Sequence, residues 1–214
     1  MPKIFLLSFI LLSGIFTKAQ TQTRFNFFIG PQVTTARYLA GGKKQPTDFK
    51  PGFQLGAGAK IEFENRLYFS PSLYYSLKGY KVTLNQAAAP PDLAAVNNNT
   101  TVHTLEAAFL LQYDFSNKPS HIFFKLGPSA DFQLFGKEKF DRVDGGHVDR
   151  PMKYGFADYG RYAVSAVLHV GYEMSNNLIF YIHYAYGLSN LNNSDTGPSI
   201  QSRVFGITVG KFLK

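Results

Sequence analysis

The sequence contains neither cysteine nor tryptophan. Without cysteine no disulfide can form, so an exported protein with this sequence must take its stability from another source. After the first residues, no apolar run reaches the roughly 18 residues that a transmembrane helix requires. A Gly-x-Ser-x-Gly phrase and a phosphate-binding glycine loop are also absent. The net charge is +8, but the basic residues do not form a cluster within a nucleic-acid-binding motif. Nucleic acid is therefore not an expected partner.

The first 19 residues have the features of a targeting segment. Lys3 supplies a positive charge, residues 4–15 form an apolar core, and Thr17-Lys18-Ala19 matches a small-x-small cleavage site. This core is too short to span a bilayer as a helix, which argues against a membrane anchor. We therefore expect residues 1–19 to be a cleaved signal peptide and residues 20–214 to form one domain.

The remaining chain alternates between apolar and polar residues with a period of two. The alternation is clearest in residues 53–64 and 67–82, which the polar pair Asn65-Arg66 separates. A period of two places side chains on opposite faces of a strand, so this stretch predicts a hairpin. Each arm exceeds the typical soluble strand of about 5–6 residues and could cross a bilayer at a tilt, which takes about 9–11 residues.

Eight such segments can be drawn, and the connections between them alternate in length. The segments are 24–35, 52–64, 67–82, 101–115, 121–136, 159–173, 178–188 and 200–212. Short turns fall at 65–66, 116–120 and 175–177, and long polar connections at 38–50, 83–100, 137–158 and 189–199. This predicts an all-β fold: an eight-stranded antiparallel up-and-down transmembrane β-barrel with short periplasmic turns and longer extracellular loops.

A soluble sandwich or lipocalin-like barrel is the alternative, and it would turn the apolar residues inward and the charges outward. The polar face carries many glycines and serines, which fit a narrow lumen better than a surface in water. Pro31, Pro71 and Pro128 lie in similar phrases on the apolar face. Because proline cannot donate a ladder hydrogen bond, we expect a local bulge or break at all three.

Several phrases resemble the PorT-type outer-membrane β-barrel family. They are Gly52-Phe53-Gln54-Leu55-Gly56, residues 74–80 (YYSLKGY), Leu126-Gly127-Pro128 and residues 184–190 (YAYGLSN). The resemblance implies an outer-membrane location and an eight-stranded fold. It implies no single activity, since only some members are tied to protein secretion. The chain departs from the pattern at its end, where Phe212 is followed by Leu213-Lys214, whereas such barrels often end on an aromatic residue that the insertion machinery reads.

The polar face gathers charged and histidine side chains that would point into the lumen. Charges at membrane depth are costly unless they face inward and pair, and eight strands leave a lumen just wide enough for side chains. We therefore predict a plug of ion pairs rather than an ion path. Its expected members are Lys60, Glu62, Glu64, Glu106, Asp114, Lys125, Asp131, Arg161, His169 and His183, with Lys78 and Glu173 on the same face.

Within this network, Glu106 and Asp131 are expected to approach each other, neutralised by Arg161 or Lys125. His169 and His183 are expected to face each other, but a metal site needs three or four ligands and the spacing indicates no third. His103, with Thr101 and Thr104 nearby, matches no recognised nucleophile motif. No catalytic residue, cofactor or metal is therefore predicted.

These features predict an integral barrel of the bacterial outer membrane with a structural or surface-interaction role and no enzyme activity. Its expected partners are outer-membrane lipid, the barrel-insertion machinery and other envelope proteins that contact the loops. Two alternatives stay open: an accessory component of a secretion or envelope-assembly complex, and a lipid-modifying outer-membrane enzyme.

Overall fold

The computed structural model describes residues 23–85 and 94–213. The predicted signal peptide and residues 86–93 of one predicted loop lie outside the described residues. Within the described part, no helix is long and apolar enough to cross a membrane.

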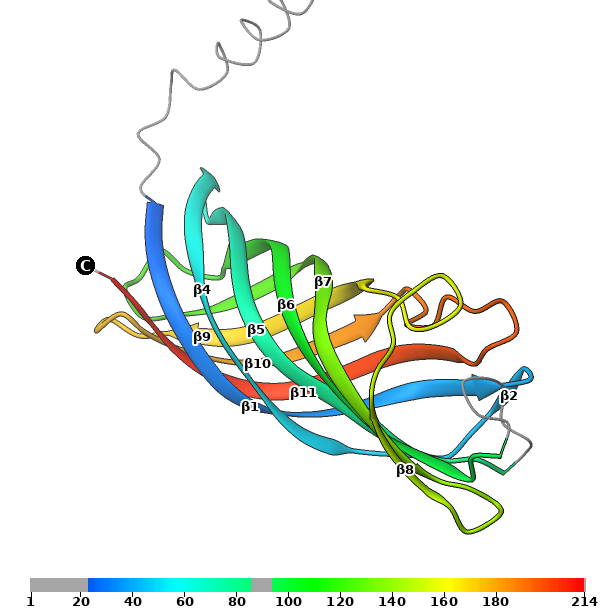
Figure 1. Cartoon of the computed structure of the whole chain (residues 1–214). Coiled ribbons are helices and arrows are strands. Elements are labelled where there is room, and N and C mark those ends of the chain that lie inside the picture. The colour runs from blue at the N-terminus through cyan, green and yellow to red at the C-terminus, as the bar shows by residue number, and fades with distance from the viewer. Residues whose placement is uncertain (1–22, 86–93, 214) are drawn as a thin grey trace, which may run out of the picture.

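Eight long antiparallel strands form a closed ring (Figure 1). They are β1 (Thr23–Ala40), β4 (Lys50–Glu64), β5 (Leu67–Thr83), β6 (Asn97–Asp114), β7 (His121–Asp141), β9 (Tyr162–Glu173), β10 (Leu178–Gly187) and β11 (Ser199–Phe212). Each long strand pairs with the next one, and β11 pairs back with β1 to close the ring. The predicted eight-stranded antiparallel barrel is confirmed.

The two ends of the barrel differ in the length of their connections. The short turns, the start of β1 and the end of β11 lie at one end, called here the turn side; the longer connections lie at the other, the loop side (Figure 1). Three short strands extend the loop side: β2 (Lys43–Lys44) pairs with β1, β3 (Thr47–Asp48) with β5, and β8 (His147–Pro151) with β7.

Strand structure on the loop side therefore reaches further than predicted. β1 continues to Ala40 and β7 to Asp141, so the segments 38–50 and 137–158 contain strands where loops were expected. Pairing within these extensions satisfies backbone groups that a loop would leave to water. β9, in contrast, begins at Tyr162, three residues after the predicted start at 159.

Apolar side chains cover the outside of the ring. On β1, Phe27 is 58% and Ile29 51% exposed, whereas the alternating Asn26 and Phe28 are buried. On β7 the apolar outer face runs from Ile122 to Phe135, about 40 Å along the strand. At a tilt of about 40° this covers roughly 30 Å of height, enough for the apolar band of a membrane barrel.

A β-bulge near the loop side reverses the alternation in β7. Thr104 pairs with Gln133 but His103 pairs with Phe135, so Leu134 is an extra residue on β7. Inward positions consequently change from odd numbers, such as Gln133, to even numbers, such as Glu138. Phe135 is 58% exposed on the outer face, where its ring stacks on that of His103 at a centroid distance of 4.2 Å.

The three prolines interrupt pairing on one flank without a bulge. Pro31 pairs with Phe53 on β4, while on the other side the β1–β11 ladder omits residues 30 and 31 and resumes in the same register. Pro71 and Pro128 behave likewise, with gaps toward β4 and β6 respectively. The predicted bulge or break is confirmed as a break on one flank, because a missing N–H removes one bond without adding a residue.

The bulge can be tested by introducing single cysteines into this cysteine-free chain. With a lipid-soluble thiol reagent in vesicles, we expect strong labelling at positions 132, 134 and 135 and weak labelling at 131, 133 and 136. A strict period of two would leave position 135 unlabelled, and that result would contradict the bulge. Strong labelling at 131 and 133 instead would show that the faces of the sheet are inverted.

Candidate functional site: the charged lumen

One lysine lies between two carboxylates in the middle of the lumen. Lys78 on β5 places its Nζ 2.7 Å from Glu106 Oε1 on β6 and 2.7 Å from Asp131 Oδ2 on β7. All three side chains are buried. Glu106 and Asp131 are direct partners across the β6–β7 ladder, as predicted. We call Lys78, Glu106 and Asp131 the central cluster.

The predicted neutralising residues, Arg161 and Lys125, lie elsewhere. Arg161 precedes β9 and is exposed, with its guanidinium 4.8 Å from the centroid of the Tyr154 ring. Lys125 is buried, but it lies six residues from Asp131 along β7, which is about 20 Å toward the turn side. Its Nζ donates to Ser70 Oγ at 3.0 Å. That part of the prediction is wrong, because the period of two gives the face of a residue but not its neighbour on another strand.

A second group of paired charges lies near the turn side. Lys60 Nζ is 2.5 Å from Asp114 Oδ2 and 2.9 Å from Glu173 Oε2, and Arg24 Nη1 pairs with Glu173 Oε1. His121 completes this turn-side cluster. Two cations thus face two carboxylates on the turn side of the lumen, so the charges of the two buried acids there are compensated by Lys60 and Arg24.

His121 brings an imidazole to this group that the sequence analysis did not place in the lumen. Its Nδ1 lies 2.8 Å from the carbonyl oxygen of Lys118. Its Nε2 is 2.9 Å from Asp114 Oδ2, outside hydrogen-bond geometry, and 3.6 Å from Glu173 Oε2. These three side chains could hold a metal ion only if Lys60, which already bonds to both carboxylates, moved away.

The strand alternation could have identified both overlooked residues. His121 shares its parity with Lys125 and Asp131, and Arg24 shares its parity with Asn26. Both lie within two residues of the start of their strands.

Glu62 and Glu64 are exposed and do not belong to the lumen, so that prediction is wrong. The described pairing of β4 with β1 ends at Thr23–Ile61, and the register with β5 shifts between Glu62 and Glu64. The end of this hairpin therefore extends beyond the ring into solvent (Figure 1).

His169 and His183 face each other across β9 and β10, as predicted. Their ring centroids are 5.8 Å apart, and His169 stacks on Tyr181 at 4.6 Å. Within residues 23–85 and 94–213, the one group of three possible metal-ligating side chains is Asp114, His121 and Glu173, so this pair gains no third ligand. His103 lies on the outer face, where its Nδ1 is 2.5 Å from Tyr75 Oη.

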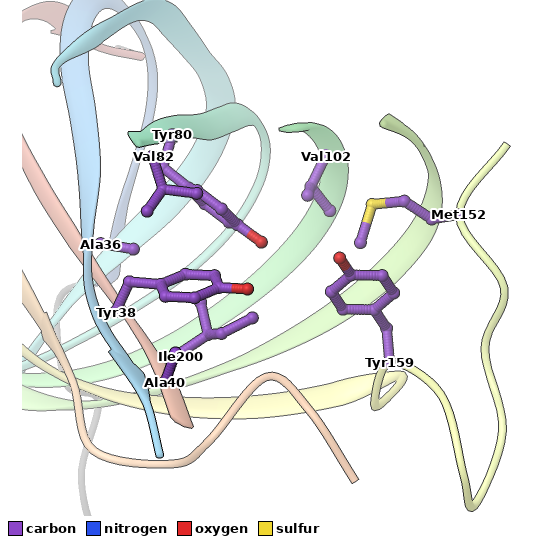
Figure 2. Close-up of a cluster of buried hydrophobic side chains, with 9 residues drawn as sticks. All are labelled: Ala36, Tyr38, Ala40, Tyr80, Val82, Val102, Met152, Tyr159 and Ile200. Carbon is purple, nitrogen blue, oxygen red and sulfur yellow. The ribbon is translucent and has the colours of Figure 1, made fainter. Parts of the chain in front are cut away.

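An apolar cluster fills the lumen beyond the central cluster, toward the loop side. We call it the mouth cluster; Figure 2 shows its side chains, from β1, β5, β6, β11 and the segment 152–161, pointing toward one another. Its members are Ala36, Tyr38, Ala40, Tyr80, Val82, Val102, Met152, Tyr159 and Ile200. Met152 comes from a segment predicted to be an external loop and Tyr159 from the predicted start of a strand, so the sequence analysis missed this packing.

Tyr159 also binds the buried carboxylate of Glu138 beside the mouth cluster. Its hydroxyl donates to Glu138 Oε2 at 3.0 Å, and Arg150 Nε donates to Glu138 Oε1 at 2.6 Å. Burial raises the pKa of Tyr159 well above its ordinary value of 10, so the phenol remains a neutral donor. The segment 152–161 is thereby held against the inner wall.

The spaces left between these layers are small. A cavity of about 20 Å³ lies beside Lys78, Tyr80 and Gln133, and one of about 10 Å³ lies beside Lys125 and His169. One water needs about 10–15 Å³ of such volume, so each cavity has room for one or two waters.

Comparisons with known proteins agree with this architecture at the level of the family. A family model described as "Outer membrane protein beta-barrel domain" matches residues 18–193. No curated protein matches the sequence.

Similar solved structures include three bacterial proteins. Ail, the attachment invasion locus protein of Yersinia pestis, is 14% identical with a TM-score of 0.46, over 90% of this chain and 99% of that one. OprG from Pseudomonas aeruginosa is 12% identical with a TM-score of 0.48, over 90% and 97% of the two chains. Neisserial surface protein A is 14% identical with a TM-score of 0.40, over 86% and 96%.

Replacing Lys78 by methionine should strongly destabilise the barrel. The change leaves Glu106 and Asp131 buried beside each other without a cation, and breaking a buried pair in this way costs about 3–5 kcal/mol. Unfolding in urea from detergent micelles would measure it. Lys139→Met is the matched control: this lysine pairs with Asp149 on the surface, where a pair contributes about 0–1 kcal/mol. Equal losses for the two variants would contradict the structural role of the central cluster.

Proposed function

The chain belongs to the outer membrane protein β-barrel domain family, and on that premise we propose that it is a non-catalytic barrel with a structural or surface-interaction role and a lumen closed to solutes. In the bacterial outer membrane such barrels place their short turns in the periplasm and their longer loops outside. The turn side then faces the periplasm and the loop side the cell exterior. A cleaved signal peptide at residues 1–19 would deliver the chain to the barrel-insertion machinery. The PorT-type resemblance within this family stays a prediction.

The observation that carries the closed lumen is the succession of layers along the barrel axis. A solute entering from outside would meet the mouth cluster, then the central cluster and finally the turn-side cluster. Opening a path would separate Lys78 from two buried carboxylates, which is costly at low dielectric. The polar groups of the lumen thus support a plug rather than a route for ions.

A surface role is supported by what the loop side presents outward. Val143, at the end of the β7–β8 hairpin, is 77% exposed, and Phe156, in the segment 152–161, is 99% exposed. Exposed apolar side chains on a rigid scaffold are suited to contacts with other proteins. Partners in the envelope or outside the cell would approach the protein there.

The proposal predicts that the purified protein forms no large channel. In planar bilayers we expect no stable, ohmic conductance steps of porin size, because the mouth and central clusters fill the lumen. An open porin recorded in the same bilayers provides the positive control. A reproducible large conductance from the wild-type protein would contradict the closed lumen and favour a channel.

A further inference from the structure

Two arginines lie near each other on the outer face of the barrel, toward the loop side. Arg37 is on β1 and Arg203 on β11, and their neighbours along the strands, such as Tyr38 and Val204, are buried inside. Arg37 pairs with Gln201 in the ladder, and Arg203 with Thr35. The arginines are therefore diagonal neighbours on one face, with backbones about 7–8 Å apart, a separation that long side chains can bridge.

Neutral groups hold both arginines in place. Arg203 lies over the ring of Tyr186 at 3.5 Å, and its Nη1 donates to the carbonyl oxygens of Ser202 and Gly187 at 2.8 and 3.3 Å. Arg37 Nη1 donates to Gln201 Oε1 at 3.4 Å. A guanidinium has five N–H donors, so several remain available on each side chain.

In the part of the chain that the structure describes, no carboxylate compensates the charge of these arginines. Neither forms an ion pair within residues 23–85 and 94–213, and β1, β10 and β11 contain no acidic residue. The lysines of β7 differ: Lys137 and Lys139 lie 2.9 and 3.0 Å from the carboxylate of Asp149. Their hydrogen bonds hold the pKa of Asp149 below its ordinary value, so that acid stays ionised and pairs with both lysines.

The two arginines stand at the loop-side edge of the apolar band. Toward the turn side, the next outward side chain after Arg203 is Phe205, and after Arg37 the polar Thr35 precedes Val33; Val33 and Phe205 are exposed apolar residues. A membrane would therefore bring its acyl chains against Val33 and Phe205 and its headgroups to the level of the arginines. On the loop side these headgroups belong to the outer leaflet, which in bacterial outer membranes is rich in phosphorylated glycolipid.

We propose that Arg37 and Arg203 bind a phosphate group of an outer-leaflet glycolipid. Arginine forks match phosphate geometry and form charge-assisted hydrogen bonds of about 2.7–2.9 Å. Gln201, opposite Arg37 in the ladder, adds a neutral side chain that can donate to the same oxygens. This site goes beyond a structural or surface role, because it gives the barrel a specific lipid ligand.

The test measures binding of purified lipid A by the protein in phosphatidylcholine nanodiscs, with native mass spectrometry as the readout. Phosphorylated lipid A is compared with enzymatically dephosphorylated lipid A. The wild-type protein should prefer the phosphorylated form by about tenfold or more, and the double variant Arg37→Gln/Arg203→Gln should lose that preference, since a charged hydrogen bond contributes roughly a factor of ten. Arg37→Lys should bind with intermediate affinity, because the charge remains without the fork.

The matched control is Lys137→Gln/Lys139→Gln, which removes the same number of positive charges from the outward face of β7 on the loop side. This variant should keep the wild-type preference, because both lysines are already paired with Asp149. An equal loss in the control would show general attraction to a basic surface and would overturn the site. Equal binding of dephosphorylated lipid A would do the same. If the arginines bound a soluble sulfated oligosaccharide in preference to lipid A, the ligand would be an extracellular polyanion, and the lipid site would be overturned. Circular dichroism confirms that each variant retains its strands.

Discussion

Closure of the sheet by the β1–β11 ladder is the constraint on which the rest of the structure depends. Inside a bilayer no water is available to unpaired backbone groups, and each would cost several kcal/mol, so a sheet can cross only without edges. The ladder runs from Asn26–Phe212 to Leu39–Ser199 and gives β1 a partner on both sides. Because the closed ladder leaves no backbone edge unpaired, the apolar residues of the outer face can turn to lipid.

A closed ring of eight strands also determines what the interior can contain. The space is so narrow that Lys60 Nζ on β4 reaches Glu173 Oε2 on β9, on the opposite side of the ring, at 2.9 Å. Most charges directed into this space are paired with an opposite charge. Lys78 pairs with two carboxylates, and Lys60 and Arg24 pair with the two carboxylates of the turn-side cluster, whereas Lys125 donates to a serine. The outer face follows the opposite rule, with apolar residues around the ring and Arg37 and Arg203 as the proposed phosphate site toward the loop side.

The strand pattern was sufficient to predict the closed barrel, its two faces and the approach of Glu106 to Asp131, because a period of two determines the face of every residue. It could not predict which cation joins that pair, since a contact across the lumen between Lys78 and Asp131 depends on register and curvature. The alternation of apolar and polar residues also gave wrong positions at the ends of the strands, where it stops being regular. Glu62 lies beyond the ring and Arg161 precedes its strand. The segment 152–161, which includes the predicted strand start at Tyr159, folds inward for packing that has no periodic signal.

The measurement that tests the closed membrane barrel most directly is the electrophoretic mobility of the protein before and after boiling, combined with its location in cell fractions. A closed ring whose ladders are buried in lipid resists dodecyl sulfate until it is heated. The account predicts that the protein is recovered with outer membranes and that unboiled and boiled samples run at different positions. Identical mobility of the two samples, with recovery in the soluble periplasmic fraction, would contradict it.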